Sequence, residues 1–439
     1  MTPGPDPRAI DAALESAGLP PLPRTSWLEI DLDALIDNVT ALREAAGPGV
    51  RIVPVVKADA YGHGLVPVGL ALDHGGADGL AVATLDEALA LREGGVSVDV
   101  LLLQPVRPEL VEVAESAGVT VTLGDRSNVA AVLAAAARRE GPPLRVELEV
   151  ETGLGRGGLA AEDVREVVGL VRSSRRLELV GAWSHLQAPE DRDRSRVQVA
   201  RFDAALEALA AARHVASSGG LLASSAPVYD AIRPGLATYG IVPDELLAQP
   251  AAAADTPLAA VSARLRPVMA LRARAIRVAE LPRGWGVSYG PTWVAERDSR
   301  IATLPVGYGD GWPRSLSNRA EALVRGRRVP LVGNVAMDAV MADVTDVPGP
   351  AVDVDDVFTL LGPDGEERID AHELARSRTT NAWEVVTSSS PRLTRVYYRA
   401  AVPVGLRSLT SLALTGPRDS WPASSSGTGI SATWRSTRS

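Results

Sequence analysis

The sequence of 439 residues contains no cysteine. This absence excludes disulfide bonds, thiolate nucleophiles and cysteine-ligated zinc or iron–sulfur sites. The five histidines are scattered along the chain, and none of them forms an HxxxH pair that could bind a metal ion. We therefore expect no metal site.

Long apolar runs and a basic charge balance are also missing. No stretch offers the ~20 uncharged apolar residues that a membrane-spanning helix needs. The N-terminal MTPGPDPRAIDAALESAGLPPLPR lacks the basic-then-apolar order of a secretory signal, so we expect a soluble protein of the cytoplasm. A formal net charge of −9 disfavours nucleic acid and anionic membranes as partners, because both favour a basic surface. Small molecules and other proteins remain as partners.

Eight short apolar segments alternate with helix-like stretches between Arg51 and Gly235. Apolar residues recur at helical spacing in the stretches between them. Apolar strands joined by helical crossovers form a parallel sheet covered on both faces, and eight of them close into a (β/α)₈ barrel of the TIM type. The eight segments are RIVPVVKA, GLAVAT, VDVLLLQP, VTVTLGD, LRVELEVET, LELVGAWSHL, HVASS and AIRPG.

Beyond about residue 250 the pattern becomes that of a separate, mainly β domain. RIATLPVGYG, RVPLVGN and VFTLLG are typical of strands and are separated by glycine and proline turns. A tail rich in Ser, Thr, Gly and Pro follows, which predicts disorder. The expected organisation is an N-terminal extension (1–26), the barrel (27–248), a linker around LLAQPAAAADTP, the mainly β domain (258–405) and the disordered tail (406–439).

The first predicted strand ends in VVKADAYGHG, which places Lys57 near the C-terminal mouth of the barrel. A buried amine loses part of its charge and becomes nucleophilic, as Schiff-base formation with an aldehyde cofactor requires. A lysine at the barrel rim can equally extend its amine into solvent. Spacing alone leaves both interpretations open.

The seventh and eighth strands end in HVASSGG and AIRPGLATYG, at the place where barrels commonly bind phosphate. Ser218, Gly219 and Gly235 are the candidate phosphate ligands, and Arg233 lies close by in the sequence. Taken alone, the pattern fits two ordinary turns at least as well, since glycine often serves only backbone geometry there.

The fifth strand alternates glutamate with apolar residues. Glu147, Glu149 and Glu151 share one face, and no strand face of a barrel meets open solvent. At least one carboxylate should therefore be paired inside the barrel mouth, and Arg156 is the candidate partner. An arginine held there can bind a substrate carboxylate, although a surface loop arginine is an equally good interpretation of the pattern.

Together these segments resemble the alanine racemase family, from WLEIDLDAL at Trp27 to RLTRVYY at Arg392. VVKADAYGHG matches the family's cofactor-lysine motif, and GVSYGPTW, LPVGYGDGWPR and GNVAMD match three further motifs in the expected order. The resemblance implies a pyridoxal phosphate-dependent racemase of alanine or a related small amino acid. It also implies a homodimer whose active sites are shared between subunits.

The resemblance assigns the two catalytic bases. Lys57 would hold pyridoxal phosphate as a Schiff base and exchange the α-proton on one face, and Tyr289 of the neighbouring subunit would serve the other face. A phenol is a weak base at neutrality, so such a tyrosine needs a nearby cation or hydrogen-bond donor.

The resemblance also implies that Arg233 hydrogen-bonds to the nitrogen of the cofactor's pyridine ring. Because an arginine is always charged, it would disfavour protonation of that nitrogen and so weaken electron withdrawal by the ring.

The other roles implied by the resemblance fall into three groups. They are Tyr61, His185, Ser218, Arg233, Gly235, Leu236 and Trp383 around the cofactor, Arg156, Tyr308 and the backbone N–H of Met337 around the substrate, and Glu149 and Asp338 in support.

Four positions depart from the family pattern. Glu149 stands where many members carry a lysine that becomes carbamylated, and we predict that it orients Arg156 directly and needs no bicarbonate. Ser217 replaces a usual asparagine, Glu151 an aspartate, and Trp383 a tyrosine whose hydroxyl meets the cofactor phosphate. The indole N–H of a tryptophan can still donate a hydrogen bond.

Three alternatives stay open on the sequence. One is a racemase of a different amino acid in a specialised pathway. A barrel-type pyridoxal phosphate decarboxylase shares the architecture, but such enzymes commonly use a cysteine as proton donor. A non-catalytic pyridoxal phosphate carrier would also use a lysine, but carriers of that type lack the second domain.

Overall fold

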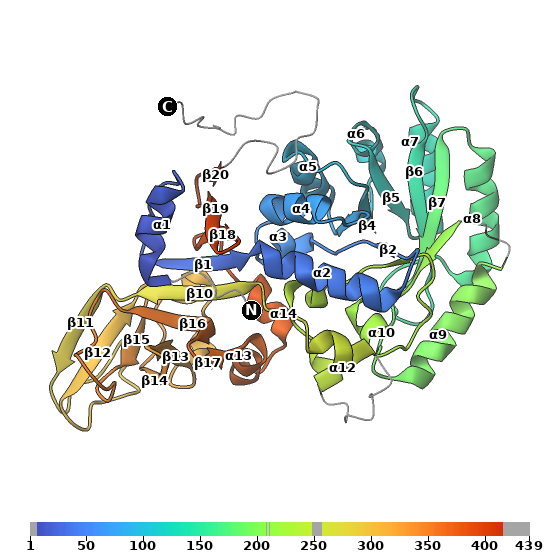
Figure 1. Ribbon diagram of the computed structural model, residues 1–439. Coiled ribbons are helices and arrows are strands. Elements are labelled where there is room, and N and C mark those ends of the chain that lie inside the picture. The colour runs from blue at the N-terminus through green and yellow to red at the C-terminus, as the bar shows by residue number, and fades with distance from the viewer. Residues whose placement is uncertain (1–6, 208, 210, 248–256, 416–439) are drawn as a thin grey trace.

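The structure, a computed structural model, describes residues 7–207, 209, 211–247 and 257–415 (Figure 1). A barrel of parallel strands and covering helices lies on the right of Figure 1, and a mainly β domain lies on the left. This division confirms the fold class expected from the sequence.

Eight short parallel strands form the barrel in the described part of the chain. Strands β3 to β8 pair in sequence order and β2 pairs with β9. Single bridges at Val55–Ala81 and Ser217–Arg233 join β2 to β3 and β8 to β9, so the ring is closed as predicted. The strands are β2 (Arg51–Ile52), β3 (Leu80–Val82), β4 (Val100–Pro105), β5 (Val119–Leu123), β6 (Leu144–Glu149), β7 (Leu177–Trp183), β8 (Ala212–His214) and β9 (Ala231–Ile232).

Helices connect the barrel strands and cover the ring. Three of them begin at an aspartate, Asp31, Asp125 or Asp191, whose carboxylate accepts a hydrogen bond from an otherwise unpaired N–H of the first turn. The helices are α2 (Leu32–Ala46), α4 (Leu65–His74), α5 (Leu85–Glu93), α6 (Val111–Ser116), α7 (Arg126–Ala136), α8 (Ala161–Ser173), α9 (Arg192–Ala205) and α10 (Ser218–Leu222), with α11 (Asp244–Leu247) and α12 (Pro257–Ser262) after the last strand.

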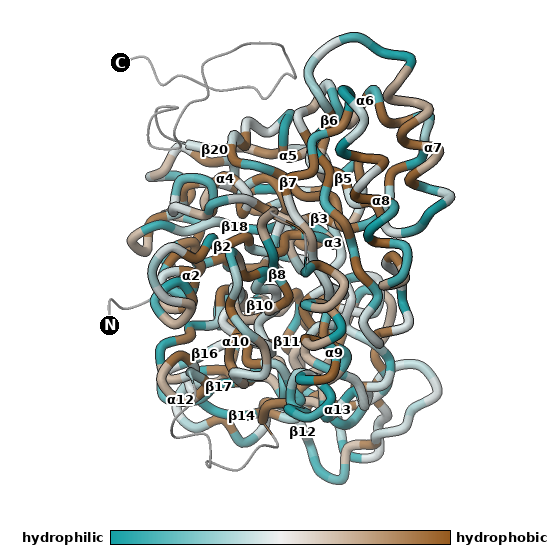
Figure 2. The backbone as a smooth tube through the Cα atoms, turned by 90° about the vertical axis from the view of Figure 1, so that its right-hand side faces the viewer, coloured by the Kyte–Doolittle hydropathy of each residue, from teal (hydrophilic) through white to brown (hydrophobic). Residues whose placement is uncertain are grey.

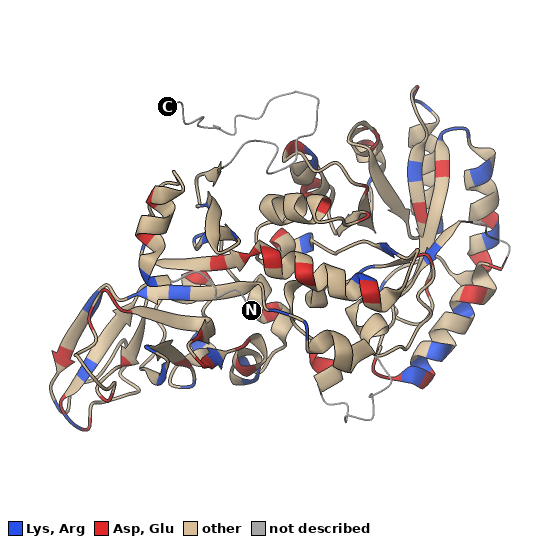
Figure 3. Ribbon diagram, in the orientation of Figure 1, with Lys and Arg blue, Asp and Glu red and all other residues tan. Residues whose placement is uncertain are grey.

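The helices turn an apolar side inward and a charged side outward. In α8 the buried residues Val164, Val167 and Val171 follow helical spacing. Burying each such side chain contributes about 1.5–3 kcal/mol. Figure 2 shows the apolar and polar stretches along the chain, and in Figure 3 acidic and basic residues alternate along α9.

The second domain is a strongly bent sheet with two helices. In the described residues the strand order is β11-β12-β15-β14-β13-β16-β10-β1-β18-β19-β20, and β17 pairs with β16. Its strands are β1 (Ser26–Asp31), β10 (Met269–Arg274), β11 (Arg277–Leu281), β12 (Ser299–Leu304), β13 (Glu321–Val324), β14 (Arg327–Val332), β15 (Val340–Asp343), β16 (Val357–Asp364), β17 (Glu367–Ile369), β18 (Thr394–Arg399), β19 (Val402–Arg407) and β20 (Leu412–Leu414), and its helices are α13 (Ala371–Arg378) and α14 (Ala382–Thr387).

Both ends of the described chain differ from the predicted domain limits. Strand β1, which we had placed with the barrel, lies between β10 and β18 of the second sheet. Helix α1 (Ile10–Ser16) of the N-terminal extension packs its apolar side against Trp27, Val396 and Leu406. Residues 406–415, predicted as part of a disordered tail, contain the end of β19 and all of β20. The rest of that tail and residues 248–256 of the predicted linker lie outside the described residues.

Candidate active site

A cavity of about 330 Å³ opens at the C-terminal ends of the barrel strands. All the sequence-predicted cofactor residues line it, together with the predicted substrate arginine. These residues come from the loops after five barrel strands and from α14 of the second domain. They are Lys57, Tyr61, Arg156, His185, Ser218, Arg233, Gly235, Leu236 and Trp383.

The chain carries Lys57 out of the barrel in a left-handed turn. In α3 (Lys57–Tyr61) the φ angles of Ala58, Asp59, Ala60 and Tyr61 are 53°, 55°, 53° and 52°. Residues other than glycine avoid this conformation, which costs about 1–2 kcal/mol each. Contacts with the rest of the molecule must therefore hold the turn.

Polar contacts hold this left-handed turn from both domains. The Ala58 N–H donates to Glu87 Oε1 at 2.6 Å, and Asp59 Oδ1 accepts from the Leu65 N–H at 2.8 Å. Arg407, in β19 of the second domain, donates to the same Asp59 oxygen at 2.6 Å. The position of Lys57 thus depends on how the two domains pack.

The environment of Lys57 favours the neutral amine. Burial lowers the pKa of Lys57, the positive charge of Arg156 lowers it further, and Glu87 opposes the shift. A neutral amine is the form that attacks an aldehyde. Lys57 is also the only lysine in the sequence. The other 44 of the 45 lysine and arginine residues are arginines.

A chain of three buried polar side chains runs beneath the cavity. Arg233 donates through Nη2 to Ser184 O at 2.8 Å and through Nη1 to His214 Nδ1 and, at 3.0 Å, to His214 O. An arginine can only donate, so His214 Nδ1 accepts. The proton is therefore on Nε2, which lies 2.8 Å from Glu147 Oε2 and donates to it. The Arg233 guanidinium also lies 4.9 Å from the ring centroid of Trp183.

Electrostatics keep this chain of side chains ionised at its ends. Burial opposes the charge on Glu147, but His214 and Arg233 outweigh it and hold the pKa of that carboxyl below its usual range. Burial lowers the pKa of Arg233 to about 10, which still leaves it a cation at neutral pH. The ring of His185, which also lines the cavity, stays neutral, because burial and the charge of Arg233 lower its pKa to about 3.

Hydroxyl groups and backbone N–H groups gather at one end of the cavity. Ser218 Oγ, at the start of α10, accepts from the N–H groups of Gly235 at 2.9 Å and Ala237 at 3.2 Å. A side chain at Gly235 would collide with the hydroxyl of Tyr61, so this position requires glycine. Burial raises the pKa of Tyr61 to about 12, and its hydroxyl remains a donor.

Arg156 reaches the cavity beside an acidic partner. Its Nη2 lies 3.6 Å from Glu149 Oε1, and Glu149 itself is buried at the end of β6. Burial raises the pKa of Glu149 while Arg156 lowers it. More than half of the Arg156 side chain is exposed, which leaves it free to bind an anion.

The departure at Glu151 preserves the turn that leads to Arg156. One Glu151 oxygen accepts from the N–H groups of Gly153 and, at 2.8 Å, of Leu154, and the other accepts from Gly155 at 2.9 Å. The side chain of Glu151, although longer than that of the usual aspartate, therefore still organises the glycine-rich turn.

Four other predicted residues do not line this cavity and lie together on the second domain. Tyr289, Met337 and Tyr308 are 76%, 52% and 42% exposed. Their loops are bonded to one another: the Asn334 amide donates to Tyr289 O at 2.8 Å, Tyr308 N to Ala336 O at 3.1 Å and Gly309 N to Met337 O at 2.9 Å. We call the exposed surface of Tyr289, Tyr308 and Met337 the tyrosine patch. Asp338, the fourth, follows Met337 and accepts from Arg392 at 2.6 Å.

Some functional candidates were not found from the sequence. Trp183 lies beneath Arg233, Glu245 lines the cavity, and Glu87 holds the lysine turn. Glu87 had a detectable signal, because Thr84 stands three residues earlier and the two form a helix capping box. The His214–Glu147 contact joins residues far apart in the chain, and no local pattern indicates it.

Comparison with known proteins places both domains. Residues 30–243 match the model of the alanine racemase N-terminal domain and residues 268–397 that of the alanine racemase C-terminal domain. The alanine racemase of Symbiobacterium thermophilum is 39% identical over 383 residues, which cover 85% of this chain and 97% of that protein.

Solved structures agree with the sequence comparison. Alanine racemase from Bacillus anthracis, solved with bound L-Ala-P, aligns with this chain with a TM-score of 0.78 and 30% sequence identity. The alignment covers 88% of this chain and 98% of the Bacillus anthracis chain. The Bartonella henselae enzyme, with covalently bound pyridoxal phosphate, has a TM-score of 0.74 and 27% identity and covers 86% and 100% of the two chains. The chain described here belongs to the alanine racemase family.

Proposed function

We propose that this protein is a pyridoxal phosphate-dependent racemase that interconverts the L and D forms of alanine or a closely related small amino acid. The observation that carries the proposal is the cavity at the barrel mouth, in which the only lysine of the sequence lies with two hydroxyl groups, two arginines and a neutral histidine. The relatives reported above support the same activity.

The residues of the cavity fit the cofactor. Lys57 would bind its aldehyde, Tyr61 and Ser218 its phosphate, and Arg233 its ring nitrogen, while the neutral ring of His185 offers a flat surface for stacking. Trp383 and the backbone at Gly235 and Leu236 complete the walls on the phosphate side.

When bound, pyridoxal phosphate withdraws electrons and so makes the α-hydrogen of a joined amino acid acidic. Arg156 binds the substrate carboxylate and thereby fixes which face of the α-carbon meets Lys57. Lys57 Nζ takes or returns the proton on that face, and the lowering of its pKa favours the neutral amine, which can accept a proton. Racemisation needs a second base on the opposite face.

A partner subunit supplies that second base in this proposal. Within one chain the tyrosine patch lies outside the set of residues that line the lysine cavity, and Tyr289 is the most exposed of its members. A homodimer that sets the partner subunit's Tyr289, Tyr308 and Met337 over the cavity would bury these side chains and complete the site. Exposed aromatic and apolar patches of this kind commonly mark protein interfaces.

Glu149 takes the place of a modified lysine in this proposal. It is buried, carries a carboxylate 3.6 Å from Arg156 and needs no added carbon dioxide to do so. The arrangement supports direct orientation of Arg156 by Glu149.

The domain limits and the cellular location also remain proposals. We propose that the described residues between 32 and 262 form the barrel and that residues 7–31 and 263–415 form the second domain. Strand β1 pairs within the second sheet, α1 packs against that sheet, and α12 contacts the barrel helices α2 and α10. No helix among the described residues is long and apolar enough to cross a membrane. Cytoplasmic residence stays a prediction, which cell fractionation tests.

The deciding experiment combines cofactor labelling with product analysis. Borohydride reduction of the holoprotein should add one cofactor mass at Lys57, and a panel of L-amino acids incubated with it should yield the D form of alanine or a close relative by chiral chromatography. Release of carbon dioxide without racemisation would point to a decarboxylase. Labelling without α-deuterium exchange of any amino acid would point to a carrier, and absence of the label would overturn the proposal.

A further inference from the structure

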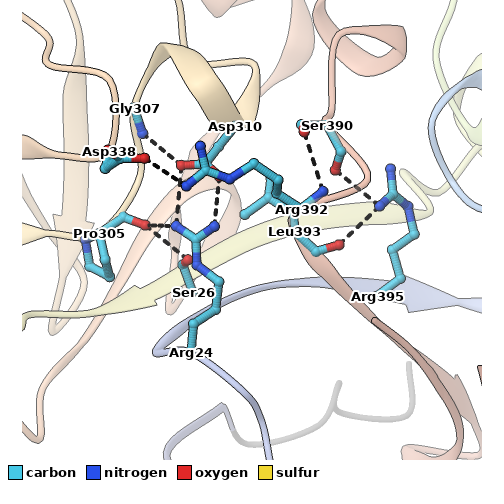
Figure 4. Close-up of polar contacts among 10 residues, drawn as sticks. All are labelled: Arg24, Ser26, Pro305, Gly307, Asp310, Asp338, Ser390, Arg392, Leu393 and Arg395. Carbon is cyan, nitrogen blue, oxygen red and sulfur yellow. Dashed lines mark hydrogen bonds and ion pairs between the residues drawn. The ribbon is translucent and has the colours of Figure 1, made fainter. Parts of the chain in front are cut away.

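One short segment contacts both the lysine turn and the loops that carry the tyrosine patch. Residues 388–395, which lead from the end of α14 into β18 and which we call the connector, carry two arginines three positions apart. Figure 4 shows that Arg392 points toward Asp310 and Asp338, whereas Arg395 lies away from them beside the connector backbone. The two side chains therefore serve different regions of the molecule.

Arg395 holds the turn that presents Lys57. Its side chain is fully buried, and its Nε donates to Gly62 O at 2.8 Å, directly after the left-handed turn. Its Nη2 lies 3.7 Å from Asp59 Oδ2 and donates to Ser389 O at 3.0 Å. Arg395 thus links the connector to the lysine turn through one backbone and one carboxylate contact.

Arg392 holds the loops that carry the tyrosine patch. Its Nη2 donates to Asp338 Oδ1 at 2.6 Å, and its Nε lies 3.6 Å from Asp310 Oδ1. Its guanidinium packs so closely on Gly309 that a side chain at that position would collide with it. Gly309 follows Tyr308, and Asp338 follows Met337, so Arg392 contacts the neighbours of two members of the patch.

The buried Asp310 ties these loops to the N-terminal extension. Its carboxylate accepts from Arg24 Nη1 at 2.6 Å and from the Gly307 N–H at 3.0 Å (Figure 4). Its backbone carbonyl accepts from the Ser390 N–H at 3.1 Å. Arg24 also donates to Pro305 O. A carboxylate without solvent exposure costs free energy unless it is paired, and Arg24 and Arg392 supply that pairing.

We propose that the connector positions two different active sites of the dimer. Arg395 orients the lysine turn of the site on its own chain, and Arg392 orients the tyrosine patch that completes the site of the partner. Both are positioning residues, since neither lines the cavity. This inference rests on the proposed function, because it requires a dimer with shared sites.

A heterodimer with one complete active site separates the two roles. One subunit carries Lys57→Ala and keeps Tyr289, and the other carries Tyr289→Phe and keeps Lys57, with different affinity tags for purification. Only the site that combines the intact lysine with the intact tyrosine can then work. An arginine substitution can be placed in either subunit of this parent heterodimer, so each variant is its own control for folding.

The proposal predicts opposite effects of placement. Arg392→Gln should lower kcat/KM by about tenfold or more in the subunit that donates Tyr289 and by less than about twofold in the other, since small misplacements of catalytic groups are costly. Arg395→Gln should show the reverse pattern. Arg399 lies on β18, as Arg395 does, and forms an exposed ion pair with Asp33 of α2. Arg399→Gln should therefore be neutral in either subunit.

A measurement without turnover tests the Arg395 half separately. In homodimers, Arg395→Gln should reduce the yield of borohydride-fixed cofactor at Lys57 at limiting cofactor concentration, and Arg392→Gln should leave it unchanged. If either glutamine variant fails to fold, Asp59→Asn weakens the Arg395–Asp59 ion pair and Asp338→Asn the Arg392–Asp338 ion pair, each at the more exposed partner.

The outcomes distinguish the two levels of the argument. An inactive parent heterodimer that binds cofactor would overturn the shared site and with it this inference. An active parent in which each arginine substitution has the same effect in both subunits would leave the proposed racemase intact and refute the positioning roles.

Discussion

Replacing Ala58 by glycine should stabilise the protein, although glycine usually destabilises. Ala58 has a φ of 53° and its side chain is exposed, so it pays the left-handed penalty without gaining packing. Glycine removes that penalty of about 1–2 kcal/mol. The hydrogen bond from the residue-58 N–H to Glu87 is kept, because it uses only the backbone.

The unfolded chain sets the opposing term. Glycine gains backbone freedom on unfolding, which costs the folded state about 0.5–1 kcal/mol relative to alanine. The net gain for Ala58→Gly is therefore about 0–1.5 kcal/mol. Ala130, exposed in the middle of the right-handed helix α7, provides the matched control, and Ala130→Gly should lose about 1 kcal/mol.

The difference between the two variants isolates the left-handed penalty, since the unfolded-state term is common to both. Urea unfolding of the cofactor-free protein, followed by circular dichroism, should give a free energy of unfolding about 1–2 kcal/mol higher for Ala58→Gly than for Ala130→Gly. Equal losses in the two variants would refute the reasoning that the lysine turn is strained.

Three further predictions concern the site. Tyr289→Phe should retain borohydride labelling of Lys57 but slow racemisation by about 10²–10⁴-fold, as loss of one general base does; a variant with wild-type turnover would contradict the two-base proposal. Glu149→Gln should raise KM for the amino acid by about 5–30-fold with a smaller change in kcat, because Arg156 is no longer oriented by the negative charge of Glu149. An unchanged KM without added bicarbonate would exclude this orienting role of Glu149. Arg156→Gln removes a positive charge that lowers the pKa of Lys57, so that pKa should rise and the pH midpoint of cofactor capture by the cofactor-free protein should shift upward; a downward shift would contradict the assignment.

Periodicity and motifs predicted the elements that follow local rules. The eight apolar segments became the eight barrel strands because each buries side chains on both faces of a covered sheet. The cavity-lining residues gathered as expected because they follow the C-terminal ends of parallel strands.

Non-local pairing explains what the sequence did not reveal. The pattern of β1 predicts a strand, but its place between β10 and β18 depends on strands more than 230 positions away in the sequence. One such contact is the buried ion pair between Glu29 and Arg272, at 2.9 Å. The left-handed turn at Ala58 was equally hidden, since alanine itself favours the right-handed helix. Both features are imposed by tertiary contacts that override local preference.

A protein with a single lysine has only one side-chain amine to offer any carbonyl compound. With 44 arginines carrying the remaining basic charge, reducing sugars and stray aldehydes find no competing side chain on the surface, and the reactive amine lies recessed in a cavity lined by the barrel loops. Amine-directed crosslinkers, immobilisation supports and isotopic tags are consequently confined to Lys57 and the α-amino group. Under the proposed function, the occupancy of this one side-chain amine measures how much of a preparation has bound cofactor.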